Sequence, residues 1–526
     1  MTERQVPANV CAPATLRRSL RAMQEHFDRK RNRTWALAIF VGSLLIYGAV
    51  CGQTLLEPSP HFHFTDMAES FLHGRLDTDT PRRTAGQKPQ PNDPPGLQDA
   101  VNRQLKGSGW NDWASYRVLT LRGGEVVKGV FPWKDVPGPR QHEFHTLDGR
   151  LMIIDVDRDL KVGCDPKQKW RKCDDVIYQI SFPPFPAVVM MPLAKIWHYR
   201  ANDVLVTVLF AALSALLTWL WLARLRREEL ITHDTADRAW LTAFLAFGTA
   251  TFFVSAHASV WFTALVIGMT LHLGYLLAAE GGRRPFLAGV LLGLGVATRT
   301  PLLFAGLFLP LEVLFPDGRW LGGQGKSAIP EAFKKLALYA IPLALIGGVL
   351  AWFNWARWEN PGEFGHLYLL EGTRGPTREH GLFSFTFLNH NLGTALLNMP
   401  QFVADTPVVL ITRHGLGLLT SSPAFLALLA QRPTSAPQES SRSAALSRHL
   451  MWSVAAVAIP GLFYQNDGWQ QFSYRFAMDF LPPLLGILAL RLPVLNRKVK
   501  ALIVLSVVIQ LFGAITFGRA EQFYYD

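Results

Sequence analysis

The chain has 526 residues, of which 49% are hydrophobic and only 17% are charged, and its positive mean hydropathy of +0.15 excludes an ordinary soluble multidomain enzyme. Its formal net charge of +12 does not predict a nucleic-acid partner, because the basic residues gather in alternate loops between apolar runs, as membrane topology requires. The composition therefore predicts an α-helical polytopic membrane protein surrounded by membrane lipids.

Most of the long apolar runs could cross the hydrocarbon core of a bilayer. They occupy residues 35–55, 204–222, 241–254, 260–279, 336–352 and 502–517. Together with shorter segments they predict about eleven transmembrane helices. The basic loops place the N-terminus in the cytoplasm and the C-terminus outside, which predicts a multi-pass membrane protein.

The runs and loops divide the chain into six regions. They are a basic cytoplasmic N-terminus at residues 1–34, a first transmembrane helix at 35–55, an outer loop at 56–182, a transmembrane core at 183–354, a second outer loop at 355–406, and a C-terminal transmembrane bundle at 407–526 with an outer motif at 465–479.

A short amphipathic helix is predicted directly after the first span, lying along the membrane surface. Its apolar residues recur at helical spacing, Asp66 and Glu69 lie one turn apart on the same face, and Gly74 is a plausible stop. Asp66 could deprotonate an attacking hydroxyl or hold a divalent cation such as Mg or Mn. The alternative is a helix cap or a surface charge.

The remainder of the first outer loop is composite. Residues 80–115 are rich in Pro, Gly, Asn and Gln and are expected to be irregular, whereas five short β-type runs between residues 116 and 182 predict a small β-rich periplasmic insert. Cys164 and Cys173 could close a disulfide in an oxidising periplasm. A metal site is the alternative, but two thiols without a nearby histidine are only half of one.

Prolines interrupt two later apolar segments. Residues 183–197 predict a partial helix that dips back to the membrane. Residues 285–315 are longer than one crossing needs and carry Arg299 near their middle, where a charge is costly. They predict two short helices that meet at Arg299 and Pro301, with the arginine at the outer surface.

Three polar stretches, at residues 61–79, 357–390 and 465–479, fall on the predicted outer side and would line a cavity for a charged lipid head group and a polar substrate. Arginine matches phosphate geometry, although each one could instead anchor at the interface or pair with a carboxylate. The aromatic rings could stack on a sugar or form an interfacial belt. The candidates are Arg299, Arg374, Arg378, Arg413 and Arg475 for phosphate, and Trp469 and Tyr474 for sugar.

Four stretches resemble, in order, landmarks of the polytopic glycosyltransferases of the C-type fold, a superfamily that includes protein mannosyltransferases and aminoarabinose transferases. They are T-D-M-A-E-S-F-L-H-G-R-L, F-P-P-F-P-A-V-V-M-M-P, G-L-G-V-A-T-R-T-P and G-W-Q-Q-F-S-Y-R-F-A-M-D-F-L-P. The resemblance implies that Asp66 is the acidic residue that acts as base or metal ligand, and that Arg299 and Arg475 contact a lipid phosphate. It also implies inverting transfer of a sugar from a polyprenyl-phosphate-linked donor to a periplasmic lipid, glycan or protein acceptor. The enzyme would then lie in the bacterial inner membrane with its active site facing the periplasm.

The chain departs from the common pattern of that superfamily, since Asp66 is not directly followed by a second acidic residue and the insert is unusually large. Metal dependence and the acceptor are therefore left open. Two other functions remain as alternatives. One is a transporter or flippase for a lipid-linked or anionic substrate, for which the expected two-fold internal repeats are not found. The other is a non-catalytic envelope-assembly protein that binds a partner through the insert.

Overall fold

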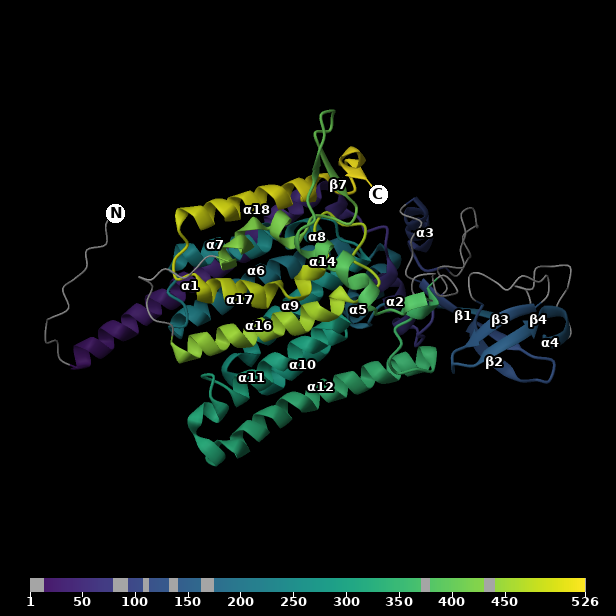
Figure 1. Ribbon diagram of the computed structural model, residues 1–526, viewed down its shortest axis with the longest axis horizontal. Coiled ribbons are helices and arrows are strands. Elements are labelled where there is room, and N and C mark those ends of the chain that lie inside the picture. Colours follow the sequence, from purple (N-terminus) through teal and green to yellow (C-terminus); the bar gives the residue numbers. More distant parts are fainter. Residues whose placement is uncertain are drawn as a thin grey trace.

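A computed structural model describes residues 14–78, 93–106, 113–131, 141–161, 175–369, 379–429 and 440–525. Most of the helices run along one long axis, and a small antiparallel sheet projects beyond one end of them (Figure 1). We call this end the sheet end, and we call the end at which α12 begins the opposite end. Five residues of the sequence analysis, Asp79, Cys164, Cys173, Arg374 and Arg378, lie outside the described residues, so the disulfide stays a prediction.

Long and short helices share this axis. They are α1 (Ala14–Cys51), α6 (Asp203–Arg227), α7 (Thr235–Phe247), α8 (Thr251–Ala256), α9 (Val260–Ala279), α10 (Pro285–Val296), η6 (Thr300–Leu307), α11 (Phe308–Leu314), α12 (Ile329–Trp358), α16 (Ser441–Leu462), α17 (Leu481–Arg491) and α18 (Arg497–Thr516). The predicted span at residues 241–254 is divided between α7 and α8.

By length and composition, five helical stretches of the described residues can cross a membrane, as a polytopic helical membrane protein requires. They are Arg31–Leu56, Asp203–Arg227, Val260–Gly282, Gly325–Trp358 and Arg497–Thr516. Each contains or closely matches one of the apolar runs in the sequence. The apolar helices Pro285–Val296, Thr300–Leu314 and Leu481–Arg491 are shorter. The number of about eleven crossings stays a prediction.

The predicted β-rich insert is confirmed as a five-stranded antiparallel sheet in the order β4-β3-β2-β1-β5. Its strands are β1 (Trp113–Thr120), β2 (Val126–Val130), β3 (Gln141–Thr146), β4 (Leu151–Asp155) and β5 (Asp175–Ile180). Because side chains alternate along a strand, β1 directs Leu119 to a core with Phe144, and Tyr116 to a second core with Trp358 at the end of α12. The sheet is therefore docked on the helices.

Smaller elements gather at the sheet end. They are α2 (His63–Leu72), α3 (Leu97–Lys106), α4 (Val156–Asp159), α5 (Phe185–Trp197), η4 (His198–Arg200), η9 (His366–Tyr368), α14 (Leu388–Leu396), β6 (Gln401–Phe402), β7 (Val409–Thr412), α15 (Leu418–Ser421), η12 (Arg475–Asp479) and β8 (Tyr524–Tyr525). The 3-10 helix η11 (Pro423–Leu429) packs against α18 instead. The helix α3 corrects the expectation that residues 80–115 are irregular throughout.

The proline-interrupted segments fold largely as predicted. The partial helix is α5, with proline in its first turn, and the chain at residues 285–315 forms α10 followed by η6 and α11. The backbone N–H of Phe185 donates to the carbonyl of Ala297 at 2.9 Å, so the start of α5 is joined to the end of α10. Residues 409–412 differ, because they form β7 between β6 and β8 rather than the start of a span.

Candidate functional site

The acidic motif after the first span forms the short helix α2, as predicted. Gly74 follows it with a left-handed φ of 69°. Residues 63–69 are all buried, because α5 packs along the helix and its apolar side chains join a core beneath the sheet. Asp66 and Glu69 are therefore interior side chains, 1% and 4% exposed. The sequence predicted a helix lying along the membrane surface, whereas most of α2 is covered by other parts of the protein.

Among the described residues, three neutral side chains donate hydrogen bonds to the carboxylate of Asp66. The Tyr199 hydroxyl of η4 donates to Oδ1 at 2.5 Å, and Trp113 Nε1 of β1 donates to Oδ2 at 3.3 Å. The Thr78 hydroxyl also donates to Oδ2. Such hydrogen bonds favour the ionised carboxylate and fix its orientation without cancelling its charge. A buried, oriented carboxylate is suited to accept a proton from a nearby hydroxyl.

Glu69 lies one turn further along α2. His198 Nδ1 is 3.1 Å from Glu69 Oε1, and His73 Nδ1 is 3.9 Å from Oε2. Burial raises the pKa of the Glu69 carboxyl above its ordinary value of 4.5; His198 and His73 oppose this, and Asp66 adds to it. Two neighbouring carboxyl groups in different surroundings can divide acid and base roles. Asp66 suits the ionised role and Glu69 the protonated one.

Arg299 follows α10 at the sheet end, where its side chain is 17% exposed, and its place at the outer membrane surface stays a prediction. Its Nε and Nη2 donate to the two carboxylate oxygens of Asp479 at 3.0 and 2.5 Å, and its guanidinium lies 5.3 Å from the ring centre of Phe476. His272 Nδ1, on α9, is 2.9 Å from the backbone carbonyl of Asp479. The carboxylate of Asp479 lowers the free-energy cost of burying Arg299, and a phosphate bound at Arg299 would compete with this carboxylate.

Arg475 is also buried, and its Nη1 donates to the Gln470 carbonyl at 3.2 Å. Its guanidinium lies 5.4 Å from the ring centre of Phe262 and 5.6 Å from that of Phe476, so Arg475 and Arg299 both contact the Phe476 ring. The aromatic candidates differ in exposure, since Tyr474 is buried and Trp469 is 40% exposed.

The other predicted arginine, Arg413, follows β7. Its Nη2 lies 3.0 Å from Glu521 Oε2, and Glu521 is an exposed residue near the C-terminus. Arg413 Nη1 also donates to Gln470 Oε1 at 3.5 Å. Its side chain is therefore directed to the C-terminal segment and to Gln470, whereas Arg475 packs against the α9 residue Phe262.

The first turn of α9 brings the two predicted motifs together. The rings of His61 and Trp261 lie 4.6 Å apart, whereas the next residue, Phe262, packs under Arg475. A second connection runs from the sheet, where Arg357 Nη1 donates to the Ile180 carbonyl at 2.7 Å. Burial, with Arg299 and Arg357 nearby, lowers the pKa of His366 to about 4. These contacts join residues of the three polar stretches at the sheet end, and the substrate cavity expected there stays a prediction.

A metal site at Asp66 stays a prediction. Trp113 Nε1 can only donate and cannot ligate a cation, which makes its hydrogen bond to Asp66 Oδ2 unfavourable for metal binding at that oxygen. Within the described ranges, one group of three side chains has ligand atoms within 4.8 Å of one another, and it consists of His390, His414 and Asp467.

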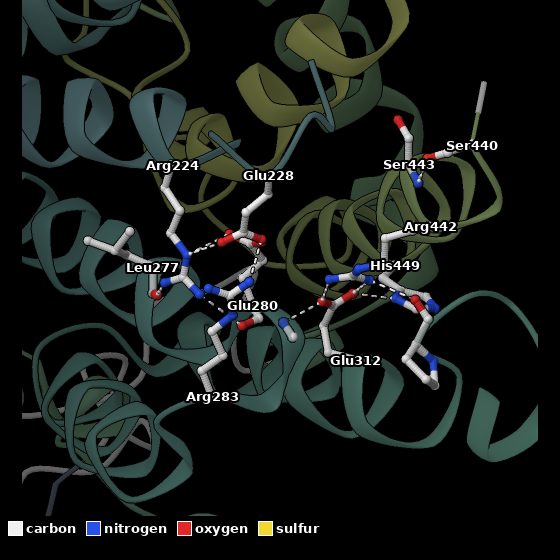
Figure 2. Close-up of polar contacts among 12 residues, drawn as sticks. Arg224, Glu228, Leu277, Glu280, Arg283, Glu312, Ser440, Arg442, Ser443 and His449 are labelled. Carbon is white, nitrogen blue, oxygen red and sulfur yellow. Dashed lines mark hydrogen bonds and ion pairs between the residues drawn. The ribbon is translucent and has the colours of Figure 1, made fainter. Parts of the chain in front are cut away.

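Carboxylates at the opposite end are paired with arginines (Figure 2). Glu312 of α11 accepts hydrogen bonds from both Nη atoms of Arg442, with a distance of 3.0 Å from Nη1 to Oε1, and from the Gly281 N–H at 2.7 Å. His449 Nδ1 lies 2.6 Å from Glu312 Oε1. Glu312 is fully buried, and its charge is balanced by residues of α16 and of the short 3-10 helix η5 (Glu280–Gly282).

A second set of contacts continues this network. Glu228 lies 3.0 Å from Arg224 Nε and 2.6 Å from Arg283 Nη2, and Arg224 Nε lies 3.6 Å from the buried Glu280. We call all these residues together the arginine network. They are Arg224, Glu228, Glu280, Arg283, Glu312, Arg442 and His449. The network joins the ends of α6, α9, α11 and α16, which is a structural role.

Sequence reasoning found Asp66 and Glu69 but missed their partners. Tyr199, Trp113 and Thr78 carry no motif, and their proximity to Asp66 exists only in the fold. Comparison with protein-family models, with curated proteins and with solved structures finds no match for this chain.

Proposed function

We propose that this protein is a multi-pass membrane glycosyltransferase. It transfers a sugar from a polyprenyl-phosphate-linked donor to a lipid, glycan or protein acceptor, with inversion at the anomeric carbon. The observation that carries the proposal is the buried carboxylate of Asp66, held by three neutral donors beside a second carboxyl group whose pKa is raised. Buried carboxyl groups of unlike pKa gather at functional sites.

In the proposed reaction, Asp66 accepts the proton of the acceptor hydroxyl while the oxygen of that hydroxyl bonds to the anomeric carbon. The bond from that carbon to the phosphate oxygen breaks at the same time, and the oxygen keeps the electron pair. Arg475 and Arg299 are the candidates to stabilise the departing phosphate, and at Arg299 the phosphate would compete with the carboxylate of Asp479. The exposed ring of Trp469 is a candidate surface for the sugar.

The distribution of charge supports an orientation. Basic residues of several loops meet at the opposite end, where Arg224, Arg283 and Arg442 belong to the arginine network (Figure 2). Positive loops remain in the cytoplasm. In a bacterial inner membrane, Asp66 and the sheet would then face the periplasm, where lipid-linked sugars and envelope acceptors are found.

The test uses the full-length protein purified in mild detergent, with its bound lipids identified by mass spectrometry and sugar transfer measured from the lipid found. We expect a polyprenyl phosphate or its glycosylated form in the wild type. Asp66→Asn should keep the lipid and lose about 10²–10⁴-fold of the transfer rate, the usual contribution of general base catalysis. Arg475→Ala should reduce the amount of bound lipid phosphate.

The matched control is Asp77→Asn, because Asp77 belongs to the same segment but pairs with Arg75 in a partly exposed position. It should transfer at the wild-type rate. Full activity in a folded Asp66→Asn protein would remove the proposed mechanism. Ordinary phospholipid alone in every sample, without transfer, would favour a transporter.

A further inference from the structure

Two turns at the sheet end are held together by one buried glutamine. Gln471 Nε2 donates to the backbone carbonyls of His414 at 2.7 Å and Asp467 at 3.0 Å. Gln471 Oε1 accepts the backbone N–H of Arg475 at 2.9 Å. The side chain is fully buried, so residues far apart in sequence are fixed relative to each other.

Glycine allows this close approach. Gly415 and Gly468 have left-handed φ values of 77° and 90°. A Cβ atom would lie 2.8 Å from Gln471 Cγ at Gly415, and 2.6 Å from Gln471 Oε1 at Gly468. Each turn therefore combines a conformation that favours glycine with contact to the same side chain. The result is a rigid base beneath His414 and Asp467.

Three potential ligands converge above this base. His390 Nε2, from α14, is 2.8 Å from Asp467 Oδ2, and His414 Nδ1 is 2.5 Å from the same oxygen. Ligand atoms around a tetrahedral zinc ion, bound at roughly 2.0–2.1 Å, are roughly 3.3 Å apart. The two histidine-to-carboxylate distances fall short of this value by less than about 1 Å, and all three ligand atoms lie within 4.8 Å of one another.

An outer hydrogen bond orients the carboxylate, because Asp467 Oδ1 accepts the backbone N–H of Trp469 at 2.9 Å and so leaves Oδ2 directed to the histidines. Exposure provides access, since the side chain of His390 is 59% exposed and that of His414 is 36% exposed, whereas Asp467 is 5% exposed. An ion here would have a buried anionic ligand and an open outer side.

We propose that His390 Nε2, His414 Nδ1 and Asp467 Oδ2 bind one divalent transition-metal ion. Two imidazoles and one carboxylate suit zinc and its neighbours better than magnesium or calcium, which prefer oxygen ligands. Three protein ligands leave a coordination position for water or for an oxygen of an anionic ligand. This site is separate from Asp66 and does not depend on the proposed transfer reaction.

The first experiment titrates the purified full-length protein with Zn²⁺ after chelator treatment and dialysis, and counts bound metal by mass spectrometry. We expect one equivalent of tightly bound zinc. His390→Gln and Asp467→Asn should weaken binding by more than the roughly 10–100-fold that loss of an outer-shell partner costs. The control is His380→Gln, which replaces an exposed histidine whose ring centre lies 6.1 Å from that of Phe387. This substitution should not affect zinc binding.

A second variant adds a direct signature. His390→Cys replaces an imidazole with a thiolate, which also ligates transition metals. With Co²⁺, this variant should show a sulfur-to-cobalt charge-transfer band that the wild-type Co²⁺ protein lacks. Equal zinc binding by wild type and both ligand variants would overturn the site, as would absence of the band in a folded His390→Cys protein.

Discussion

Two buried carboxylates, at the two ends of the helical bundle, have opposite surroundings. Asp66, at the sheet end, accepts hydrogen bonds from three neutral groups of the described chain, a phenol, an indole and an aliphatic hydroxyl. Glu312, at the opposite end, accepts from Arg442 and lies against His449, so its charge is neutralised. Both side chains are almost completely inaccessible to solvent.

The difference shows how burial alone fails to identify a functional acid. A buried ion pair is a structural arrangement whose loss leaves an uncompensated charge. A carboxylate held by neutral donors keeps its negative charge and is oriented at the same time, which is the state that a general base needs. The kind of hydrogen-bond donor beside each carboxylate therefore distinguishes Asp66 from the carboxylates of the arginine network.

The comparison is tested most strongly by replacing Glu312 with glutamine. Glu312→Gln leaves Arg442 without its anionic partner, and we expect a loss of about 3–5 kcal/mol in the free energy of unfolding. Asp66→Asn should reduce the free energy of unfolding by less, because the side chains that donate to Asp66 carry no charge. Thermal and denaturant unfolding of the two purified variants measure the difference. Equal losses of stability would remove the distinction between the two ends.

Tyr199→Phe sharpens the comparison at the sheet end. It removes the donor to Asp66 Oδ1 while keeping the ring, and a hydrogen bond to a charged group contributes about 1.5–3 kcal/mol. We expect the transfer rate to fall by roughly 10- to 100-fold, the kinetic equivalent of that energy. Tyr339→Phe is the matched control, because the Tyr339 hydroxyl donates to the Gly306 carbonyl far from Asp66 in sequence. An unchanged rate in Tyr199→Phe would argue against an oriented base.

The pH dependence of stability should reveal Glu69. Its folded-state pKa is raised above 4.5, so the folded protein holds this proton more tightly than the unfolded chain. The resulting stabilisation is complete below about pH 4.5 and is lost as the pH rises through the folded-state pKa. In Glu69→Gln, the midpoint of thermal unfolding should fall less with rising pH than in wild type. Parallel curves would contradict the raised pKa.

The smallest effect is expected for an exposed ion pair. Lys128 Nζ lies 2.7 Å from Glu359 Oε1 between the sheet and the end of α12, with both side chains about two-fifths exposed. Lys128→Ala should change the free energy of unfolding by about 0.2–1 kcal/mol at most, and less at high salt. A double-mutant cycle with Glu359→Ala gives the pair's own contribution. A loss as large as that of Glu312→Gln would mean that proximity, and not burial, determines these energies.

Local patterns in the sequence determined much of the architecture. Apolar runs located the five long apolar helices, and alternating residues between turn signals located all five strands of the sheet. Gly74 ended α2, and the cost of burying Arg299 predicted the break between α10 and η6. These features depend on neighbours within a few residues. The sequence analysis missed the helix α3 and the strand β7. The strand β7 was missed because it is stabilised by pairing with β8, which is distant in sequence.

Only the tertiary structure decided which described groups lie beside each charge. The donors to Asp66 are 12, 47 and 133 residues away in sequence, and Asp479 is 180 residues from Arg299. The sequence marked Asp66 and Arg299 as chemically important but could not distinguish a neutral donor from an opposite charge beside each. The reason is physical. Long-range hydrogen bonds form wherever packing of the helices and the sheet brings the groups together, and the periodicity of apolar residues in the sequence does not predict that packing.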